Sequence, residues 1–376
     1  MSEHHVTAKV PGKIMLSGEY AVLFGGRALA GSIDQFLTVD LVAPGFADEI
    51  TNDVDVTISS DLWDRPVSLQ SLLVPEDLAS DPLVDAVASS VQRFAVTHRP
   101  VKVSVQSDLD VTHGVGSSSA LRLAVAAATW FYAESQNDNF QAASMSQPKA
   151  LTPSSREWDM VRFAYRLQRR SQKRASGYDF ATQFLGGLVE MSPANPQVDE
   201  EAAIRAWPGN IASLDDGLPG IYEKLSENLL ILIGGEGAPT AQQMKDVLTT
   251  LDTEEKIQSL LNVSESLHEA WLNWFRDKAG AWEHLLGAVG DQRRFFESRR
   301  NFPGQFAEAI GVLPGMDEVW SYKTTGAGGE DAIIVLAPAV LHSDILTAVS
   351  KVGWRRAAFR FAPEPTTVSL SRRTLH

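Results

Sequence analysis

The sequence predicts an α+β protein organised in two domains. Segments rich in β-branched residues, some of them alternating polar and apolar positions, recur through the first 110 residues, and segments of helical composition follow them. A chain of 376 residues is long enough for two domains, because a domain usually spans roughly 100–200 residues. We place the boundary in the polar run of residues 192–201 and expect domains over residues 1–200 and 201–376.

In the first half, strands are expected where β-branched residues cluster or alternate, at residues 5–14, 35–42, 54–59 and 101–105. The last of these segments, Val-Lys-Val-Ser-Val, has the cleanest alternation in the chain. The small and apolar side chains of residues 121–132 predict a buried helix after it.

The middle of the chain interrupts this regular pattern. Residues 134–158 are polar and poor in β-branched residues, and they contain Pro148 and Pro153, so they predict an excursion between helices or a loop. A helix is expected to resume at residues 154–157, where two serines precede an acidic residue. Residues 186–191 return to strand character.

The second half mixes both kinds of element. Unbroken apolar runs predict buried strands, and longer stretches with few β-branched residues predict helices. The expected elements are strands at 229–233 and 331–336, helices at 241–251, 255–274 and 343–352, and one or two closing strands within 359–370.

Composition excludes several classes of function. With no cysteine, the chain has no disulfides, thiolate metal sites or cysteine nucleophiles. A formal net charge of −14 argues against nucleic acid or an anionic membrane as partner. No run approaches the roughly 18 apolar residues of a membrane span, and the first ten residues lack the apolar core of a signal peptide, so we expect a cytoplasmic protein.

The most informative segment lies between the strand at 101–105 and the helix at 121–132. Residues 112–120 read Thr-His-Gly-Val-Gly-Ser-Ser-Ser-Ala, two glycines and three hydroxyls at the start of a helix. Glycines let the backbone approach an anion closely, and a helix N-terminus offers unpaired N–H groups. The segment, called the cradle below, therefore predicts a phosphate site, although a solvated turn is the alternative.

Three separated segments need one explanation. They are residues 11–23, which contain Lys-Ile-Met-Leu-Ser-Gly-Glu-Tyr-Ala-Val, the cradle, and residues 323–331, Lys-Thr-Thr-Gly-Ala-Gly-Gly-Glu-Asp. Together they resemble the signature motifs of the GHMP kinase superfamily, the galactokinase, homoserine, mevalonate and phosphomevalonate kinases. The resemblance implies an N-terminal domain like ribosomal protein S5 domain 2 and a ferredoxin-like C-terminal domain, with the active site between them.

The resemblance also implies ATP and Mg²⁺ as cofactors. The residues expected to wrap the phosphates are Gly114, Val115, Gly116, Ser117, Ser118 and Ser119, with Ser118 also holding Mg²⁺. The family usually has a proline a few residues before the glycines of this motif, and this chain has His113 in that neighbourhood instead. We interpret His113 as a residue that fills the loop, with a phosphate contact as the alternative. The cradle is not a Walker motif, because no Gly-Lys-Ser/Thr follows its glycines.

Two residues are the candidates for catalysis. Residues 176–181, Ser-Gly-Tyr-Asp-Phe-Ala, resemble the segment that carries the catalytic aspartate in mevalonate-type members, which makes Asp179 the expected proton acceptor. Lys13 matches the lysine that would lie beside it and stabilise developing phosphate charge. The simpler alternatives are a turn residue for Asp179 and a solvated strand end for Lys13.

The acceptor is expected to contact residues from all the motifs. These are Lys13, Glu19, Tyr20, Arg174, Ser176, Gly177, Gly326, Ala327 and Gly328. Mevalonate kinases usually carry a metal-binding glutamate about eleven residues before the aspartate, and this chain has Gln168 there. Gln168, Tyr20 and Asp331 favour the phosphomevalonate kinases, so phosphomevalonate is the expected acceptor and mevalonate the alternative.

A phosphorylated acceptor needs further cations. Arg169, Arg170, Lys173 and Arg174 are candidates, with a solvated basic helix face as the alternative, and Lys323 is expected either to touch phosphate or to cap a strand. A non-catalytic ligand sensor on the same fold is the contrasting hypothesis, which the presence of both Lys13 and Asp179 disfavours. The oligomeric state stays open between monomer and homodimer.

Overall fold

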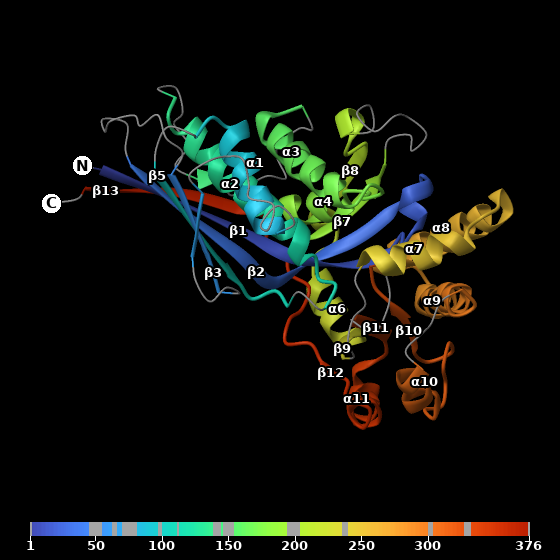
Figure 1. Cartoon of the computed structure of the whole chain (residues 1–376). Helices are drawn as coiled ribbons and strands as arrows, with labels where there is room; N and C mark the ends of the chain where they lie inside the picture. Colours follow the sequence, from blue (N-terminus) through green and yellow to red (C-terminus); the bar gives the residue numbers. More distant parts are fainter. Residues whose placement is uncertain are drawn as a thin grey trace.

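The computed structural model describes most of the chain. The described residues are 2–44, 55–61, 66–69, 81–96, 100–110, 113–137, 144–145, 154–193, 204–234, 240–299, 304–326 and 332–374. They form two β-sheets with helices around them, so the α+β prediction is confirmed (Figure 1). No helix in these ranges combines the length and the apolar character that crossing a membrane requires.

The larger sheet has nine strands and is built on two long ones. β1 (Ser2–Ser17) and β2 (Ala28–Pro44) pair antiparallel along most of their length. Around them the strand order is β4-β3-β5-β2-β1-β13-β6, while β7 pairs with both β2 and β8. The remaining strands are β3 (Asp55–Ser60), β4 (Val67–Leu69), β5 (Pro100–Ser107), β6 (Ser144–Met145), β7 (Leu188–Ser192), β8 (Asn210–Ser213) and β13 (Thr367–Thr374).

Four helices cover one face of this sheet (Figure 1). They are α1 (Pro82–Arg93), α2 (Ser117–Glu134), α3 (Arg156–Ser171) and α4 (Tyr178–Leu185). α2 packs on β1 and β2 and between α1 and α3, so that both sides of this alanine-rich helix are buried. The helix predicted at 121–132 is therefore confirmed. α3 begins as predicted, with the Ser155 side chain accepting a hydrogen bond from the backbone N–H of Trp158.

The smaller sheet has the order β10-β11-β9-β12. Its strands are β9 (Leu229–Ile233), β10 (Ser321–Thr324), β11 (Ala332–Leu336) and β12 (Arg355–Arg356). Alternate residues of β9 and β11 face two different apolar clusters, which explains why both strands are unbroken apolar runs. The buried strand predicted at 229–233 is confirmed.

Helices of the second half surround the smaller sheet and reach the larger one (Figure 1). α8 (Glu254–Phe275) and α9 (Ala281–Glu297) pack against each other, α8 on β1 and α9 on β10. The others are α6 (Ile221–Asn228), α7 (Thr240–Thr250), α10 (Gly304–Gly311) and α11 (His342–Ser350). The predicted helices at 241–251, 255–274 and 343–352 match α7, α8 and α11.

The two sheets do not divide the chain at one point. β8 and β13 come from the second half of the chain and belong to the larger sheet, β13 by antiparallel pairing with β1. The last expected segment, 359–370, starts too early, because the strand begins at Thr367. The boundary expected at 192–201 lies almost entirely outside the described residues, so the division at residue 200 stays a prediction.

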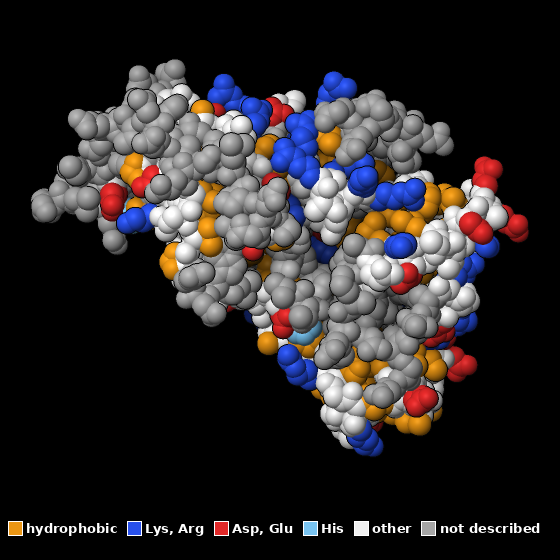
Figure 2. All heavy atoms as spheres, viewed as in Figure 1, with side chains coloured by type: hydrophobic (Ala, Val, Ile, Leu, Met, Phe, Trp, Pro, Cys, Tyr) orange, Lys and Arg blue, Asp and Glu red, His pale blue; other side chains and the backbone are white. Residues whose placement is uncertain are grey.

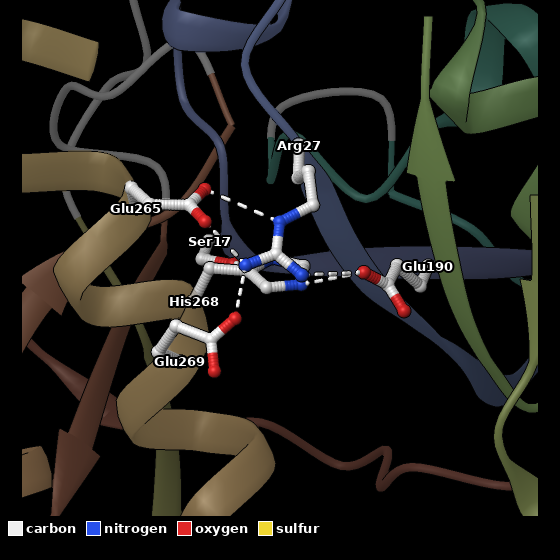
Figure 3. Close-up of polar contacts among 6 residues, drawn as sticks. All are labelled: Ser17, Arg27, Glu190, Glu265, His268 and Glu269. Atoms are coloured by element: carbon white, nitrogen blue, oxygen red, sulfur yellow. Dashed lines mark hydrogen bonds and ion pairs between the residues drawn. The ribbon is translucent and has the colours of Figure 1, made fainter. Parts of the chain in front are cut away.

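A polar network fastens α8 to the larger sheet (Figure 3). The Arg27 guanidinium lies 3.0 Å from Oε1 of Glu190 on β7 and pairs with Glu265 and Glu269 on α8. His268, fully buried on α8, lies 2.9 Å from the same Glu190 oxygen and 3.1 Å from Ser17 Oγ. The hydrogen bond with His268, followed by that with Arg27, lowers the pKa of Glu190.

Replacing Arg27 with Met should destabilise this interface. We expect the free energy of unfolding to fall by about 1–2 kcal/mol in urea denaturation at pH 7, because Glu190 loses a charged partner. Because the pKa of Glu190 is lower in the folded protein than its ordinary value of 4.5, the ionised carboxylate stabilises the fold at pH values above 4.5. That stabilisation disappears as the pH falls through the lowered pKa. The difference between variant and wild type should therefore shrink below pH 4.5.

Arg360→Met is the matched control for this prediction. Arg360 is 77% exposed and pairs with Asp34 at the surface, so its loss should change stability by no more than about 0.5 kcal/mol. Equal effects of the two substitutions would show that the Arg27 network does not stabilise the contact with α8.

Candidate active site

A cavity of about 200 Å³ opens where the starts of α2 and α4 meet β1 and the end of β10. In the view of Figure 2, the middle of the face is hollowed, and Lys and Arg side chains gather above the hollow, over α3. Most of the predicted site residues line the cavity: Lys13, Glu19, Tyr20, Gly114, Gly116, Ser117, Ser118, Ser119, Arg174, Ser176, Asp179 and Gly326. Segments from both ends of the chain thus converge on one site.

The cradle has the backbone geometry that its glycines predict. Gly114 and Gly116 have φ of 62° and 85°, and Gly116 caps the start of α2. A Cβ on Gly116 would lie 2.9 Å from Nε2 of Gln183 and 3.0 Å from Cε of Lys13, so a side chain has no room there. Gln183 Nε2 also donates to the Gly116 carbonyl at 2.9 Å. The first turn of α2 therefore points its backbone N–H groups at the cavity.

Lys13 joins the first motif to the cradle and to the segment of residues 176–181. The pairing of β1 with β2 shifts between Pro11 and Lys13, and such a bulge redirects the side chains that follow it. The Lys13 side chain is 5% exposed, and its Nζ lies 3.1 Å from Oδ1 of Asp179. The same Nζ donates to Tyr178 Oη at 2.9 Å and to the carbonyl of Gly114 at 3.3 Å.

Tyr178 is a site residue that the sequence analysis missed. It lines the cavity with Lys13 and Asp179, and its hydroxyl accepts a hydrogen bond from Lys13. Burial, together with the negative charge and hydrogen bonding of Asp179, raises the pKa of Tyr178 well above its ordinary 10. The phenol therefore stays protonated at neutral pH and can donate a hydrogen bond. Its position directly before the candidate aspartate was the available sequence signal.

Glu19 and Lys323 form a buried ion pair beneath the cavity. Gln292 of α9 donates to Oε2 of Glu19 at 2.7 Å, and Lys323 Nζ also lies 3.4 Å from the carbonyl of Met15. Lys323, which the sequence expects to touch phosphate or to cap a strand, pairs with Glu19 and is not among the residues that line the cavity. Glu19 lines the cavity, but each of its oxygens already has a partner.

The side chain of Thr325, directly after β10, holds this strand to β1. Thr325 Oγ1 accepts a hydrogen bond from the backbone N–H of Met15 and donates one to its carbonyl, both at 3.1 Å. Gly326, with φ of 63°, follows at the cavity edge, and the predicted Ala327 and Gly328 lie outside the described residues. The third motif thus reaches the cavity from the smaller sheet.

Some predicted residues lie behind the cavity wall. Val115 is fully buried in the core, and Gly177 packs against Trp207, so their side-chain positions do not line the cavity. His113 lies 3.3 Å from Asp110, and burial lowers its pKa. Since His113 does not line the cavity either, its placement agrees with loop filling.

Of the four cations before the catalytic segment, the structure brings only Arg174 into the wall of the cavity that it describes. Arg169 donates to Tyr165 and to the carbonyl of Lys173, and Arg170 lies near Ser89 and Asp85. Lys173 is exposed. Three of the four therefore belong to the basic surface over α3.

Known proteins resemble the chain along nearly its whole length. No family model matches it. The mevalonate kinase of Thermococcus sibiricus is 22% identical over 369 residues, 93% of each chain. Among solved structures, phosphomevalonate kinase of Streptococcus pneumoniae, in complex with phosphomevalonate and AMPPNP, has a TM-score of 0.66 at 16% identity, covering 95% of this chain and 99% of its own. Methanococcus jannaschii mevalonate kinase has a TM-score of 0.64 at 16% identity, covering 95% and 98%.

The chain has the GHMP kinase fold. The α+β class and the two sheets agree with the resemblance that the three motifs predicted. The roles of the individual residues stay predictions, because a likeness at this identity establishes the arrangement of the chain rather than its chemistry.

Within this GHMP kinase fold, the surroundings of Ser118 do not fit a metal held by the protein. Ser118 Oγ lies 2.6 Å from Nη1 of Arg122 and 3.4 Å from Oε1 of Gln168. A divalent cation prefers carboxylate oxygens, whereas a guanidinium and a neutral amide occupy these positions. In the described part of the chain, no group of three acidic or histidine side chains is placed to hold a metal.

Gly177 should tolerate no side chain. It caps α4 with φ of 82°, and a Cβ there would lie 2.8 Å from Cε2 of Trp207 and 2.9 Å from the Tyr165 ring. We expect Gly177→Ala to destabilise the protein by more than the roughly 1–2 kcal/mol of left-handed strain, because Trp207 must also move. Thermal and urea denaturation measure the loss.

Gly220→Ala is the control for the steric part of this effect. Gly220 also caps a helix, α6, with φ of 75°, but nothing lies within 4 Å of the position of a Cβ. Its substitution should show the strain alone, about 1–2 kcal/mol. If both variants lose the same stability, the close packing of Gly177 against Trp207 has no energetic consequence.

Proposed function

We propose that this chain transfers the γ-phosphoryl group of ATP to the hydroxyl of a small organic acid. The observation that carries the proposal is the position of Lys13, whose Nζ lies within 3.3 Å of the cradle, Tyr178 and Asp179 at once. Phosphoryl transfer needs a positive charge between the phosphate site and the group that receives the acceptor's proton, and Lys13 has that position.

The cradle binds the phosphates in this proposal. The backbone N–H groups at the start of α2 and the hydroxyls of Ser117 and Ser118 face the cavity and donate to phosphate oxygens. Ser119 also lines the cavity, but its hydroxyl donates to the carbonyl of Gly116 at 3.0 Å and thereby stabilises the turn. This division assigns two hydroxyls to the ligand and one to the loop.

Asp179 receives the proton of the acceptor. As the acceptor oxygen forms its bond to the γ-phosphorus, the bond between that phosphorus and the β,γ-bridging oxygen breaks, and ADP leaves with the electron pair. The proton of the acceptor hydroxyl passes to the Asp179 carboxylate. Lys13 stabilises the charge on the transferring group. The neutral Tyr178 hydroxyl hydrogen-bonds to both Lys13 and Asp179 and so fixes the positions of these two side chains.

We propose mevalonate as the acceptor rather than the phosphomevalonate favoured by the motifs. A phosphorylated acid brings a carboxylate and a phosphate, whereas Arg174 and Lys13 are the cations in the cavity wall that the structure describes. Lys13 already pairs with Asp179. One remaining cation matches one carboxylate, and the relatives matched by sequence, such as that of Thermococcus sibiricus, are mevalonate kinases.

Phosphomevalonate is the second candidate. Gln168 stands where mevalonate kinases usually carry a glutamate, and its amide lies at the cradle, 3.4 Å from the hydroxyl of Ser118. This departure from the mevalonate kinase pattern is the specific observation in favour of the second candidate.

The decisive assay measures ADP release from ATP with mevalonate, phosphomevalonate, galactose and homoserine in turn. We expect mevalonate to be turned over, and Asp179→Asn to lower kcat by about 10²–10⁴-fold because the amide cannot accept the proton. Asp216→Asn, at an exposed aspartate of the 3₁₀ turn Asp215–Gly217, is the control and should keep full activity.

Each other outcome of the assay points elsewhere. Turnover of phosphomevalonate alone would select the second candidate, and full activity of Asp179→Asn would remove its role as proton acceptor. Nucleotide binding without turnover of any acceptor would favour a ligand sensor.

Arg174 should contribute to binding the acceptor. We expect Arg174→Met to raise KM for the acid about tenfold or more while leaving KM for ATP within about twofold, because one charged hydrogen bond is lost. Arg170→Met is the matched control, since Arg170 lies near Asp85 and Ser89 on α1, and neither KM should change. Parallel increases of both KM values in Arg174→Met would contradict this assignment.

A further inference from the structure

Arg122 is a buried cation directly behind the cradle. It lies one helical turn after Ser118 on α2 and is 3% exposed. Its Nη1 donates to the carbonyl of Ser118 at 3.0 Å and to the hydroxyl of Ser118 at 2.6 Å, and its Nη2 donates to Ser171 Oγ at 3.2 Å. The guanidinium is therefore directed at the residue that the motif assigns to a metal.

No carboxylate pairs with Arg122 among the described residues. The salt bridges that the structure describes do not include it, and its Nε is buried without a hydrogen-bond partner. Burial lowers the pKa of Arg122 and the negative charge of Asp85 opposes this, but the described ion pair of Asp85 is with Arg170, at 3.8 Å. Burying a cation in this way is costly, because the lost hydration is not replaced by an opposite charge.

An anion in the cradle would supply the missing charge. A guanidinium stays protonated at neutral pH even when buried, so Arg122 contributes a fixed positive charge behind the first turn of α2. The helix N-terminus adds its own partial positive charge at the same place. The guanidinium of Arg122 and the N-terminus of α2 together attract a phosphate group without a metal ion.

The hydroxyl of Ser118 is oriented for a phosphate rather than for a metal. Arg122 Nη1 donates to Ser118 Oγ at 2.6 Å, so a divalent cation bound to the same oxygen would lie close to the positive charge of the guanidinium and be repelled by it. The hydroxyl proton points to Gln168 Oε1 at 3.4 Å, a long hydrogen bond that a phosphate oxygen can replace. Donation from Arg122 also polarises the hydroxyl and makes it a better donor.

We propose that Arg122 is the resident cation of the cradle, holding the Ser118 hydroxyl as a phosphate donor, so that nucleotide phosphates bind without a divalent metal on the protein. The inference rests on the proposed nucleotide site. Arg122 does not line the cavity and acts through Ser118, which makes it a positioning residue. Gln168 agrees with this arrangement, because a carboxylate there would neutralise the guanidinium.

Calorimetric titration with ADP, in EDTA and again in excess Mg²⁺, tests the proposal. For the wild type we expect the two Kd values to agree within about threefold, because the charge behind Ser118 is built in. Arg122→Met should weaken ADP binding in EDTA by about tenfold or more, the usual effect of losing a charge-assisted hydrogen bond. Arg122→Lys, which keeps the charge, should lose less than Arg122→Met.

Thermal unfolding without ligand gives a readout that a merely structural role would not produce. Removing an uncompensated buried charge should leave the melting temperature of Arg122→Met unchanged or raise it, even as ADP binding weakens. Arg93→Met, at an exposed arginine near the end of α1, is the control and should change neither quantity.

Three results would overturn the inference. One is a wild type that binds ADP only with Mg²⁺, another is Arg122→Met binding ADP in EDTA as tightly as the wild type, and the third is an equal loss in the Lys and Met variants. Failure of the wild type to bind ADP or ATP in either buffer would instead overturn the proposed function, and this inference with it.

Discussion

The pairing of β1 with β2 shifts twice, between Pro11 and Lys13 and between Met15 and Ser17, and the site depends on these two shifts. A regular strand would turn alternate side chains to opposite faces, whereas a bulge changes that alternation locally. Within these few residues of β1, the Lys13 side chain contacts the cradle, the Met15 backbone binds Thr325 after β10, and Ser17 hydrogen-bonds to His268 on α8. The end of one strand thus organises three neighbouring parts of the molecule.

Charged side chains join the larger sheet to α8 and to β10 of the smaller sheet. Apolar packing is not directional and would not by itself select one placement of these elements. Glu19 and Lys323 pair in a buried position, and Arg27 and His268 converge on Glu190 at the contact with α8. A buried charge that loses its partner costs far more than a displaced methyl group. These pairs therefore favour the relative placement of β1, α8 and β10 that forms the cavity.

Local chemistry explains which elements the sequence could predict. The strand at 229–233 is apolar throughout and the helix at 121–132 is mostly small and apolar because both are buried, and Ser155 caps its helix as a serine should. The motifs likewise predicted that Lys13 lies beside Asp179, and the structure has its Nζ 3.1 Å from Oδ1 of that residue. These patterns depend on neighbouring residues or on short motifs, so they are visible in the chain.

Tertiary pairing explains what the sequence could not predict. From the sequence, an arginine in an alanine-rich helix is expected to face solvent. In the structure Arg122 is buried and donates hydrogen bonds to Ser118 and Ser171. Tyr178 and Thr325 contact partners that are far away in sequence. The closing strand was placed too early because its pairing with β1 sets where it begins. That pairing, Ser2 with Thr374 through Lys9 with Thr367, also has a consequence for synthesis: one edge of β1 stays unpaired until β13 has been translated, so β13 is the last of the described strands to join the larger sheet.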